Sequence, residues 1–402
     1  MPRRNHKGDC LKDPVSFIDL FAGAGGFSLG LHKAGLKGVL AIERDPMAFS
    51  TLEYNLIERA NGFEWPDWFP KQSIDIREAM LKYADQMNKL RGDIDLVVGA
   101  PPCQGFSTAV KRVRQDERNM LFKEFAKFVN IVRPKIVLFE NVPGFSYKFQ
   151  DSGEYFRTYY SKLDSELRKI GYSGIKSEIF DFSKFGVPQS RKRLIICSTD
   201  RDVDPDSVLD LIRERGSKEP VGLSEAISDL RRANGLIESP DSHNFTAGLY
   251  GEPASSYQIE MRKSVTLNIP DSHRFARHRH EIEMRFQAIL SKADRNKNIN
   301  ESLRPILGLN RKRNIIPLSP ESPSPTLTTL PDDYIHYEEP RILTVREYAR
   351  IQSFPDYYQF KGKYTTGGKL RAKEVPRYSQ VANAVPPKFS SEVGNVVKKI
   401  LR

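Results

Sequence analysis

The chain of 402 residues is long enough for one large domain and a smaller second one. Its 39% apolar and 28% charged residues are typical of a folded globular protein and exclude a largely disordered chain. The formal net charge of +12 indicates a polyanionic partner, with nucleic acid as the first candidate.

Cysteine spacing and apolar patterning exclude several classes of protein. The three cysteines, Cys10, Cys103 and Cys197, lie far apart and form no CxxC pair. A disulfide framework and a zinc-thiolate site are therefore not supported, and no metal is expected. The N-terminus has no apolar signal core, and no run of about 18 apolar residues occurs in the chain. We expect a cytoplasmic protein without a membrane segment.

The first half of the chain alternates short apolar runs with helical patterns, which indicates a parallel sheet covered by helices. A strand is expected at Val15–Phe21, followed by a glycine turn, a helix over about 27–34 and a second strand at Gly38–Glu43. Further strands are expected at 94–100, 135–141, 174–182 and 192–199, with helices near 119–132 and 155–170. These elements predict a doubly wound, mostly parallel α/β domain.

The composition changes after about residue 200. Residues 201–260 contain 6 basic and 12 acidic side chains, whereas residues 261–320 contain 13 basic and 5 acidic ones. The stretch "IPLSPESPSPTLTTLP" follows, and its prolines disfavour helix and central strand. We therefore predict an N-terminal tail at 1–14, a first domain at 15–200, a smaller inserted domain at 201–325, and a return to the first domain at 326–402 that ends in a C-terminal helix.

The stretch "DLFAGAGGFSLG" at 19–30 runs from a strand through a glycine turn into a helix. Its glycines let a ligand approach the backbone and the positive end of the helix. The spacing differs from the dinucleotide fingerprint because Ser28 stands where the third glycine belongs.

Glu43 follows Gly23 by 20 residues, where an acid can accept hydrogen bonds from both hydroxyls of a ribose. Asp75 is expected at the end of a third strand that faces the same crevice. A tight corner is the alternative for the turn alone, but Glu43 favours an adenosine-bearing cofactor.

Cys103 follows two prolines at the end of an expected strand. A thiol at the carboxyl end of a parallel strand faces the crevice where ligands bind, and its reactive thiolate is favoured by nearby cations. Glu140 ends the neighbouring strand at the same edge, where burial raises the pKa of a carboxyl group and allows it to donate a proton. A small apolar filler at Cys103 and a capping or ion-paired carboxylate at Glu140 are the open alternatives. Cys197, within "RLIICST", is interpreted as core filler.

Two basic segments require separate interpretation. Arg191 and Arg193 in "PQSRKRL" are two residues apart, so on a strand both would face one side; solvated surface charge is the alternative. The segment "HRFARHRH" contains His273, His278 and His280, but no nearby cysteine pair completes a zinc site. Phosphate contact is the favoured role of this segment, which predicts that binding to a polyanion weakens steeply with salt.

Six motifs occur along the chain in the order "DLFAGAGGFSLG", "PPCQGFS", "ENVPG", "PQSRKR", "RILTVREYARIQSFPD" and "QVANAVPP". Together they resemble the ordered motif set of the DNA (cytosine-5)-methyltransferases over about residues 15–200 and 340–400. The resemblance implies the fold of S-adenosylmethionine-dependent methyltransferases, with a smaller inserted target-recognition domain. It also implies methyl transfer to carbon 5 of cytosine in a specific double-stranded DNA sequence, by base flipping and a covalent cysteine adduct.

The resemblance assigns roles to individual residues. The cofactor-binding set for S-adenosylmethionine would be Phe21, Gly23, Gly25, Gly26, Glu43, Asp75, Ile76 and Asn383. The catalytic set would be Cys103 as nucleophile, Glu140 as the acid that pairs with it, Arg193 on the target base and Arg191 in support. The DNA contacts would be Gln104, Ser107, Lys111, Arg112 and Arg114, in a candidate mobile loop that closes on the DNA backbone. A solvated basic loop is the alternative for this last set.

The resemblance further suggests the modification enzyme of a prokaryotic restriction-modification system: a nucleoid-associated monomer whose cognate restriction endonuclease acts on the same site without obligatory contact. One departure from the family pattern is Ala382, which stands where glycine is expected before Asn383. The nearest alternative is a tRNA cytosine-5 methyltransferase, although the basic block at 261–320 favours duplex DNA. A nicotinamide-dependent oxidoreductase and a DNA-binding protein without catalysis are the alternatives from other classes.

Overall fold

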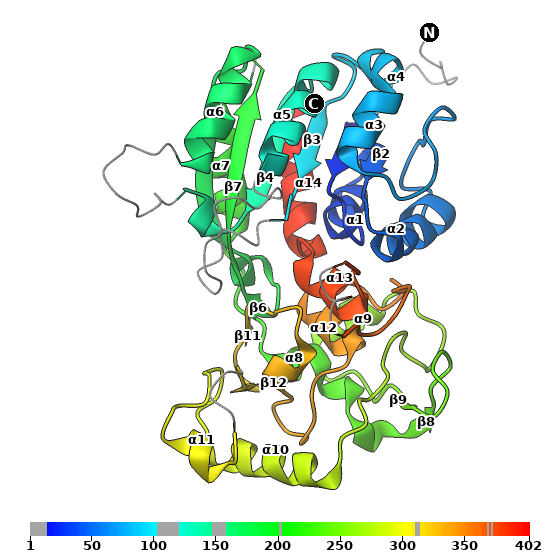
Figure 1. Ribbon diagram of the computed structural model, residues 1–402, viewed down its shortest axis with the longest axis vertical. Coiled ribbons are helices and arrows are strands. Elements are labelled where there is room, and N and C mark those ends of the chain that lie inside the picture. The colour runs from blue at the N-terminus through cyan, green and yellow to red at the C-terminus, as the bar shows by residue number, and fades with distance from the viewer. Residues whose placement is uncertain are drawn as a thin grey trace.

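The computed structural model describes residues 14–102, 120–146, 158–200, 203–309, 314–367, 370 and 373–402. Figure 1 shows an upper part built around a central sheet and a lower part made of short helices and small two-stranded ladders. Within these residues, no helix combines the length and the apolar character needed to cross a bilayer.

The sheet of the upper part has six strands in the order β2-β1-β3-β4-β7-β5. Their bounds are β1 (Ser16–Leu20), β2 (Lys37–Ile42), β3 (Leu96–Gly99), β4 (Ile136–Asn141), β5 (Lys176–Asp181) and β7 (Lys192–Thr199). The first four are mutually parallel, whereas β7 runs antiparallel to both of its neighbours. The six expected strands are thus confirmed, with their ends shifted by a few residues, and the sheet is mostly parallel as predicted.

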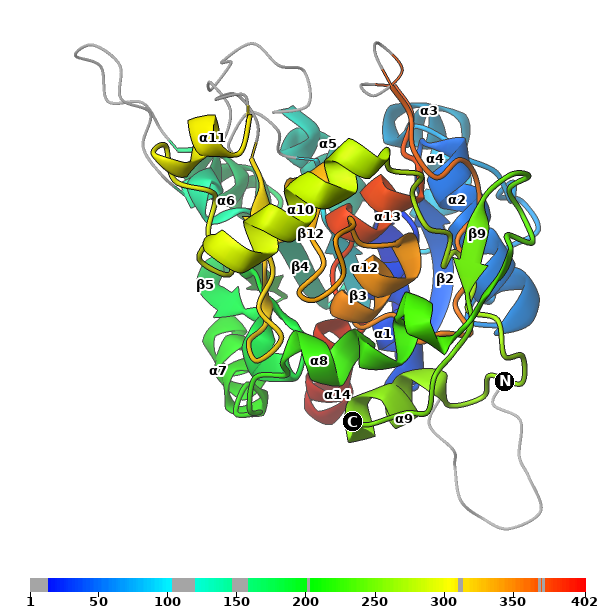
Figure 2. The same cartoon turned by 90° about the horizontal axis from the view of Figure 1, so that it is seen from below.

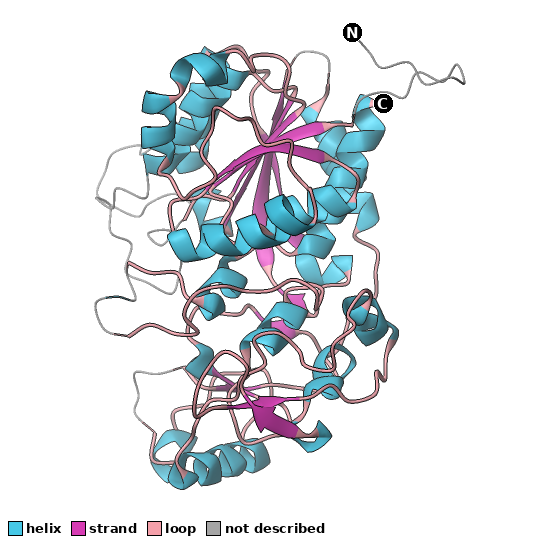
Figure 3. Ribbon diagram, turned by 90° about the vertical axis from the view of Figure 1, so that its right-hand side faces the viewer, coloured by secondary structure: helices cyan, strands magenta, loops and turns pink. Residues whose placement is uncertain are grey.

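Helices cover both faces of this sheet, as Figure 3 shows. One face packs against α1 (Gly26–Lys33), α7 (Pro205–Arg215) and α14 (Pro387–Leu401). The other packs against α3 (Ile76–Lys82), α4 (Ala84–Asn88), α5 (Leu121–Val132) and α6 (Tyr159–Lys169). The central strands β3 and β4 are buried on both sides because both sides are covered: Leu138 of β4 packs on the first face and Phe139 on the second.

Shorter elements join these layers. The helix α2 (Pro46–Leu52) continues directly into a π-helical segment, η1 (Glu53–Arg59). Single turns of 3₁₀ helix lie at η3 (Pro143–Ser146), η4 (Phe182–Phe185), η5 (Ser228–Leu230), η6 (Arg232–Asn234) and η7 (Pro331–Asp333).

The lower part contains α8 (Leu223–Ile227), α9 (Ser256–Arg262), α10 (His280–Lys292), α11 (Leu303–Ile306), β8 (Leu236–Glu238) and β9 (Thr246–Gly248). Figure 2 views this part from below, with α10 crossing in front of the other helices. The helix α7 precedes these elements in the chain but packs against β5, β7 and α14. Residues 205–215 therefore pack with the sheet domain, and the boundary at 200 remains a prediction.

The proline-rich stretch forms only strands of two residues, as its composition favours. Its strand β11 (Ser324–Pro325) pairs with β6 (Gln189–Ser190), and β10 (Ile316–Pro317) pairs with β12 (Tyr334–Ile335).

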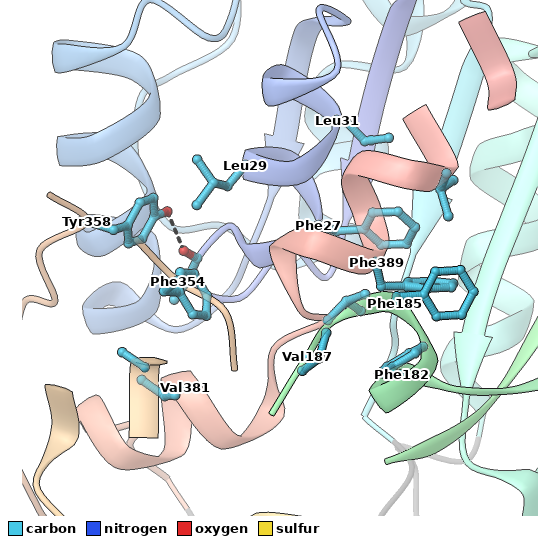
Figure 4. Close-up of a cluster of buried hydrophobic side chains, with 14 of the residues drawn as sticks. Phe27, Leu29, Leu31, Phe182, Phe185, Val187, Phe354, Tyr358, Val381 and Phe389 are labelled. Carbon is cyan, nitrogen blue, oxygen red and sulfur yellow. Dashed lines mark hydrogen bonds between the residues drawn. The ribbon is translucent and has the colours of Figure 1, made fainter. Parts of the chain in front are cut away.

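The chain then returns through α12 (Val345–Ile351) and α13 (Arg377–Asn383) to α14, which packs along α1. Phe389 of α14 packs on Phe182, with 4.4 Å between the ring centroids, in the cluster drawn in Figure 4.

The charged residues of "RILTVREYARIQSFPD" are buried and hold the lower part together. All seven residues of α12 are buried. The guanidinium of Arg350 makes two 2.6 Å contacts with the carboxylate of Asp356 and two 3.1 Å contacts with that of Asp229. Arg341 forms a similar two-pronged pair with Glu347 at 2.7 and 2.8 Å. The fork of arginine suits such bidentate pairing, so these motif residues serve the fold.

Candidate active site

The glycine turn lies where β1 ends at the carboxyl edge of the sheet. Phe21, Gly23 and Gly25 have φ angles of 60°, 56° and 80°, in the left-handed region. That region is uncommon for a residue other than glycine, and such backbone strain gathers at binding and catalytic sites. Phe21 is half-buried and lies at the edge of the sheet. Contacts with the surrounding residues must keep its backbone in this unfavourable conformation.

The three glycines of this turn face different surroundings. A Cβ atom built on Gly23 would meet no atom within 4 Å. One on Gly25 would lie 2.8 Å from the Tyr358 hydroxyl, and one on Gly26 would lie 2.5 Å from the carbonyl oxygen of Val385. The role of the three glycines in the approach of a ligand stays a prediction. Gly25 and Gly26 are required by close packing within the chain, and Gly23 alone leaves open space.

Ser28 explains why the turn departs from the dinucleotide spacing. Its Oγ donates a 2.6 Å hydrogen bond to Oδ2 of Asp19 inside the core, and both residues are at most 1% exposed. Burial raises the pKa of Asp19 to about 7, against the lowering effect of the hydrogen bonds from Ser28. A glycine at position 28 could not make this contact, which ties the start of α1 to β1.

Glu43 directly follows β2, as expected, and its carboxylate is held against the glycine turn. Oε2 accepts the backbone N–H of Gly23 at 2.9 Å, and Oε1 accepts that of Asp45 at 2.8 Å. Burial raises the pKa of Glu43, and these two backbone hydrogen bonds partly offset the increase. The carboxylate is thus fixed beside the turn, with lone pairs left for another donor.

The third strand expected at Asp75 is wrong. Asp75 is instead the N-cap of α3, and its Oδ1 accepts the N–H of Arg77 at 2.9 Å. The segment still reaches the crevice, because the N–H of Ile74 donates to the carbonyl of Glu43 at 2.8 Å. Ile76 is 2% exposed and packs in the core beneath α3, so its side chain belongs to the core.

The segment that follows Asn383 reaches the glycine turn from the other end of the chain. Asn383 is exposed at the end of α13, and the residue after it, Ala384, has its Cβ 3.0 Å from the Cβ position of Gly26. Ala382 is 2% exposed and its backbone lies outside the left-handed region. The chain therefore accommodates alanine where the family pattern has glycine.

Glu140 and Arg193 form a nearly buried ion pair at the same edge. Nε of Arg193 lies 3.0 Å from Oε1 of Glu140, and the two side chains are 13% and 11% exposed. Burial raises the pKa of Glu140, whereas the positive charges of Arg193 and Arg191 lower it. An acid in this setting can keep or share a proton at higher pH than a free glutamate.

Arg191 reaches Glu140 by a different route from the one expected. It lies between β6 and β7, so the two arginines do not share one strand. Its N–H donates to Oδ1 of Asp181 at 3.2 Å, and its side chain is 4% exposed. The expectation that both arginines lie on one strand is wrong, although the positive charges of both lower the pKa of Glu140.

Cys103 and the DNA-contact set Gln104, Ser107, Lys111, Arg112 and Arg114 lie outside the described residues, as does Cys10. The register of the sheet nevertheless shows where the chain enters this segment. Gly99, the last residue of β3, pairs with Phe139 of β4, so the chain leaves the sheet toward Pro101 and Pro102 beside Glu140. Cys197, by contrast, is fully buried in β7, and burial raises the pKa of its thiol, which confirms its core role.

A pair of buried glutamines that sequence patterning did not single out connects two motifs. Nε2 of Gln189 donates to Oε1 of Gln352 at 2.7 Å. Gln352 in turn donates to the carbonyls of Val381 and Ala384, at 3.0 and 3.1 Å, on either side of Asn383. The "PQSRKR" and "QVANAVPP" segments are therefore held in one arrangement by side-chain amides.

The histidine-rich segment is less exposed than its composition suggests. His273 is 1% exposed, with Nδ1 2.9 Å from Oγ1 of Thr344, and burial lowers its pKa well below the usual value. The phosphate contact expected for the segment is therefore wrong for His273. Arg277, Arg279 and His280 are exposed.

Comparison with known proteins agrees with this geometry. Residues 15–399 match the C-5 cytosine-specific DNA methylase family. The type II methyltransferase M.DdeI of Desulfomicrobium norvegicum is 33% identical to the chain, over 93% of the chain and 86% of that relative. M1.HphI of Haemophilus parahaemolyticus, also a type II methyltransferase, is 30% identical over 96% and 87%.

A crystal structure described as a DNA modification methyltransferase encoded within an E. coli prophage has the same fold, with a TM-score of 0.66 at 22% identity. The alignment covers 96% of this chain and 99% of that one. The chain belongs to the C-5 cytosine-specific DNA methylase family and is a DNA (cytosine-5)-methyltransferase.

Proposed function

We propose that the methyl donor is S-adenosylmethionine, held at the glycine turn. The surroundings fit an adenosine: Glu43 presents a fixed carboxylate for the ribose hydroxyls, and Gly23 leaves open space beside it. Phe21 offers a half-exposed ring on which adenine can stack; Asp75 follows Ile74, which is bonded to Glu43, and Asn383 precedes Ala384, which lies against Gly26. When bound, the cofactor supplies an electrophilic methyl group.

The chain's own residues make cytosine reactive enough to accept that group. The target base must first leave the duplex, because carbons 5 and 6 are not accessible in a stacked pair. The Cys103 thiolate adds to carbon 6, and the ring electrons move toward nitrogen 3 and the carbonyl oxygen. Glu140 donates a proton or hydrogen bond to nitrogen 3, and Arg193 stabilises the oxygen. Carbon 5 then carries enamine-like density and becomes methylated.

Release of the product reverses the thiol addition. A base removes the proton from carbon 5, the electron pair restores the double bond between carbons 5 and 6, and the thiolate leaves. The observation that supports this scheme most directly is the pair of Glu140 and Arg193, next to the point where β3 leads toward Cys103. The carboxyl group of Glu140 and the guanidinium of Arg193 are adjacent, so both can contact one flipped pyrimidine.

We assign target recognition to residues 201–325, which follow the sheet's last strand and carry the exposed basic residues near α10. Gln104, Ser107, Lys111, Arg112 and Arg114 would contact the DNA backbone around the flipped base. The relatives named as type II methyltransferases support a role as the modification enzyme of a restriction-modification system. In that role the protein acts as a nucleoid-associated cytoplasmic monomer, and a separate endonuclease reads the same site.

The proposal is tested by methyl transfer from tritiated S-adenosylmethionine to duplex DNA and, in parallel, to tRNA. Duplex DNA is expected to accept label, and bisulfite sequencing of DNA from expressing cells should locate one sequence context. Cys103→Ala should abolish transfer, and wild type should form a denaturation-resistant conjugate with duplexes that contain 5-fluorocytosine. Label on tRNA alone, or transfer that survives Cys103→Ala, would contradict the proposal.

A further inference from the structure

Tyr358 touches the glycine turn from a distant part of the sequence. Its side chain is fully buried, and its hydroxyl donates a 2.6 Å hydrogen bond to the carbonyl oxygen of Ala24, drawn as the dashed line in Figure 4. Tyr358 follows "RIQSFPD", in the segment that returns from the lower part of the molecule.

The hydrogen bond from Tyr358 restrains the peptide group between Ala24 and Gly25. The carbonyl of Ala24 and the N–H of Gly25 belong to the same peptide plane, and that N–H donates to the carbonyl of Ala22 at 2.9 Å. Both polar groups of the plane are therefore engaged, one by the turn itself and the other by Tyr358. Rotation of this plane would alter the backbone on both sides, including Gly23, whose N–H is bound by Glu43.

Tyr358 is itself held rigidly. Its carbonyl accepts a 2.7 Å hydrogen bond from Nη2 of Arg346, and the same nitrogen lies 3.0 Å from Oδ2 of Asp271 in the lower part. Its ring packs between Phe354 and Phe360, with centroid separations of 5.1 and 5.7 Å. Burial raises the pKa of Tyr358 well above its ordinary value, so the hydroxyl stays protonated and remains a donor.

We propose that Tyr358 is a positioning residue for the cofactor: its hydroxyl holds the Ala24–Gly25 peptide so that the turn is already in its binding conformation. This inference rests on the proposed binding of S-adenosylmethionine at the glycine turn. A preorganised turn binds its ligand without the cost of ordering the backbone. Loss of the hydroxyl leaves the Ala24 carbonyl buried without this donor, and the turn gains alternative conformations.

The test compares Tyr358→Phe with Tyr172→Phe. The control removes another buried hydroxyl, which donates at 2.7 Å to the carbonyl of Pro134 at the opposite edge of the sheet; Tyr172 is 6% exposed. Calorimetric titration with S-adenosylmethionine should show about a tenfold higher Kd for Tyr358→Phe, the change expected for one buried hydrogen bond. Its KM for the cofactor should rise in parallel, with kcat at saturation within about twofold of wild type. Tyr172→Phe should bind as wild type does.

Hydrogen exchange gives a second readout that does not depend on catalysis. The peptide that spans residues 20–27 should exchange faster in Tyr358→Phe and not in Tyr172→Phe. Equal cofactor affinity in Tyr358→Phe and wild type, or equal weakening in both variants, would overturn the inference while leaving the proposed function intact. Failure of the wild-type protein to bind S-adenosylmethionine would instead refute the proposed function.

Discussion

Nε of Arg193 lies 3.0 Å from Oε1 of Glu140, on two antiparallel strands whose register sets the contact. Glu140 pairs with Ile195, and Arg193 lies two residues earlier on the same strand. Residues two apart on a strand point to the same side, so the guanidinium is brought over the carboxylate. An acid with a raised pKa and a cation thereby converge where the chain leads toward Cys103.

Replacement of Arg193 by lysine keeps the charge and removes the planar fork. Because the arginine is proposed to stabilise charge that develops on the base, kcat should fall by about 100-fold, the usual loss when one such donor is removed. Methyl transfer is measured with saturating DNA and cofactor. Lys192→Ala, at the exposed neighbouring position, serves as control and should stay within about twofold of wild type. A kcat for Arg193→Lys equal to that of wild type would exclude the proposed role.

The two glycines Gly23 and Gly26 should respond differently to alanine. A methyl group at position 26 would lie 2.5 Å from the Val385 carbonyl, so the backbone must shift, at a cost of about 1–3 kcal/mol. A methyl group at position 23 meets no atom within 4 Å and only strains a φ of 56°, for about 1–2 kcal/mol. Urea unfolding should show the larger loss for Gly26→Ala. Cofactor titration should show the larger loss of affinity for Gly23→Ala, and the reverse ranking in both measurements would contradict this division.

Asp19 should make the stability of the protein depend on pH. Its pKa is about 7 in the fold and 3.8 in the reference state, so between these values the folded protein holds one more proton than the unfolded chain. The stabilisation that Asp19 contributes is fully present below about pH 4 and is lost as pH rises through 7. The free energy of unfolding changes by up to about 1.4 kcal/mol per pH unit in this range.

Asp19→Asn removes this titration and keeps an acceptor for Ser28. The free energy of unfolding of the variant, relative to wild type, should therefore rise between about pH 5 and pH 7.5. Urea titrations of both proteins at several pH values measure this difference, and effects of other titrating groups cancel in it. A difference that does not change with pH would show that Asp19 does not titrate in this range.

The buried cluster around Arg350 should be sensitive to loss of one carboxylate. Asp356→Asn removes the negative charge and one of the two oxygen acceptors that lie 2.6 Å from Arg350, and it leaves the charge of Arg350 only partly compensated. Breaking a buried pair from one side costs about 3–5 kcal/mol. The exposed pair of Glu78 and Lys82 provides the control, since Glu78→Gln should leave the unfolding free energy close to that of wild type. Similar small losses in both variants would show that the cluster contributes little.

Local sequence was sufficient for the elements and for the chemical types at the site. The central strands of the sheet are short, mostly apolar runs bounded by turns, and such periodicity depends only on neighbouring residues. The glycine turn, the position of Glu43 after β2 and that of Glu140 in β4 followed from the same local patterns. The resemblance in six motifs then identified the family. The match of residues 15–399 to the C-5 cytosine-specific DNA methylase family confirms this identification.

Long-range packing decided what these patterns left open. Alternation within "PQSRKR" suggested that Arg191 and Arg193 share a strand, whereas the chain breaks the strand at Arg191 and pairs β6 with β11. Asp75 was expected to end a strand and instead caps α3, because an aspartate before a helix can accept an N–H that would otherwise lack a partner. His273, in a strongly basic segment, is buried against Thr344.

By itself, then, the sequence determined the strands, the glycine turn and the positions of Glu43 after β2 and of Glu140 in β4, since periodicity and residue chemistry depend on neighbouring residues. Only the tertiary structure decided which groups meet: Glu140 with Arg193, Gln189 with Gln352, and Tyr358 with Ala24. The physical reason is that such contacts depend on strand register and on which surfaces exclude water. Both are set by packing between segments far apart in the chain, so they cannot be predicted from local sequence patterns.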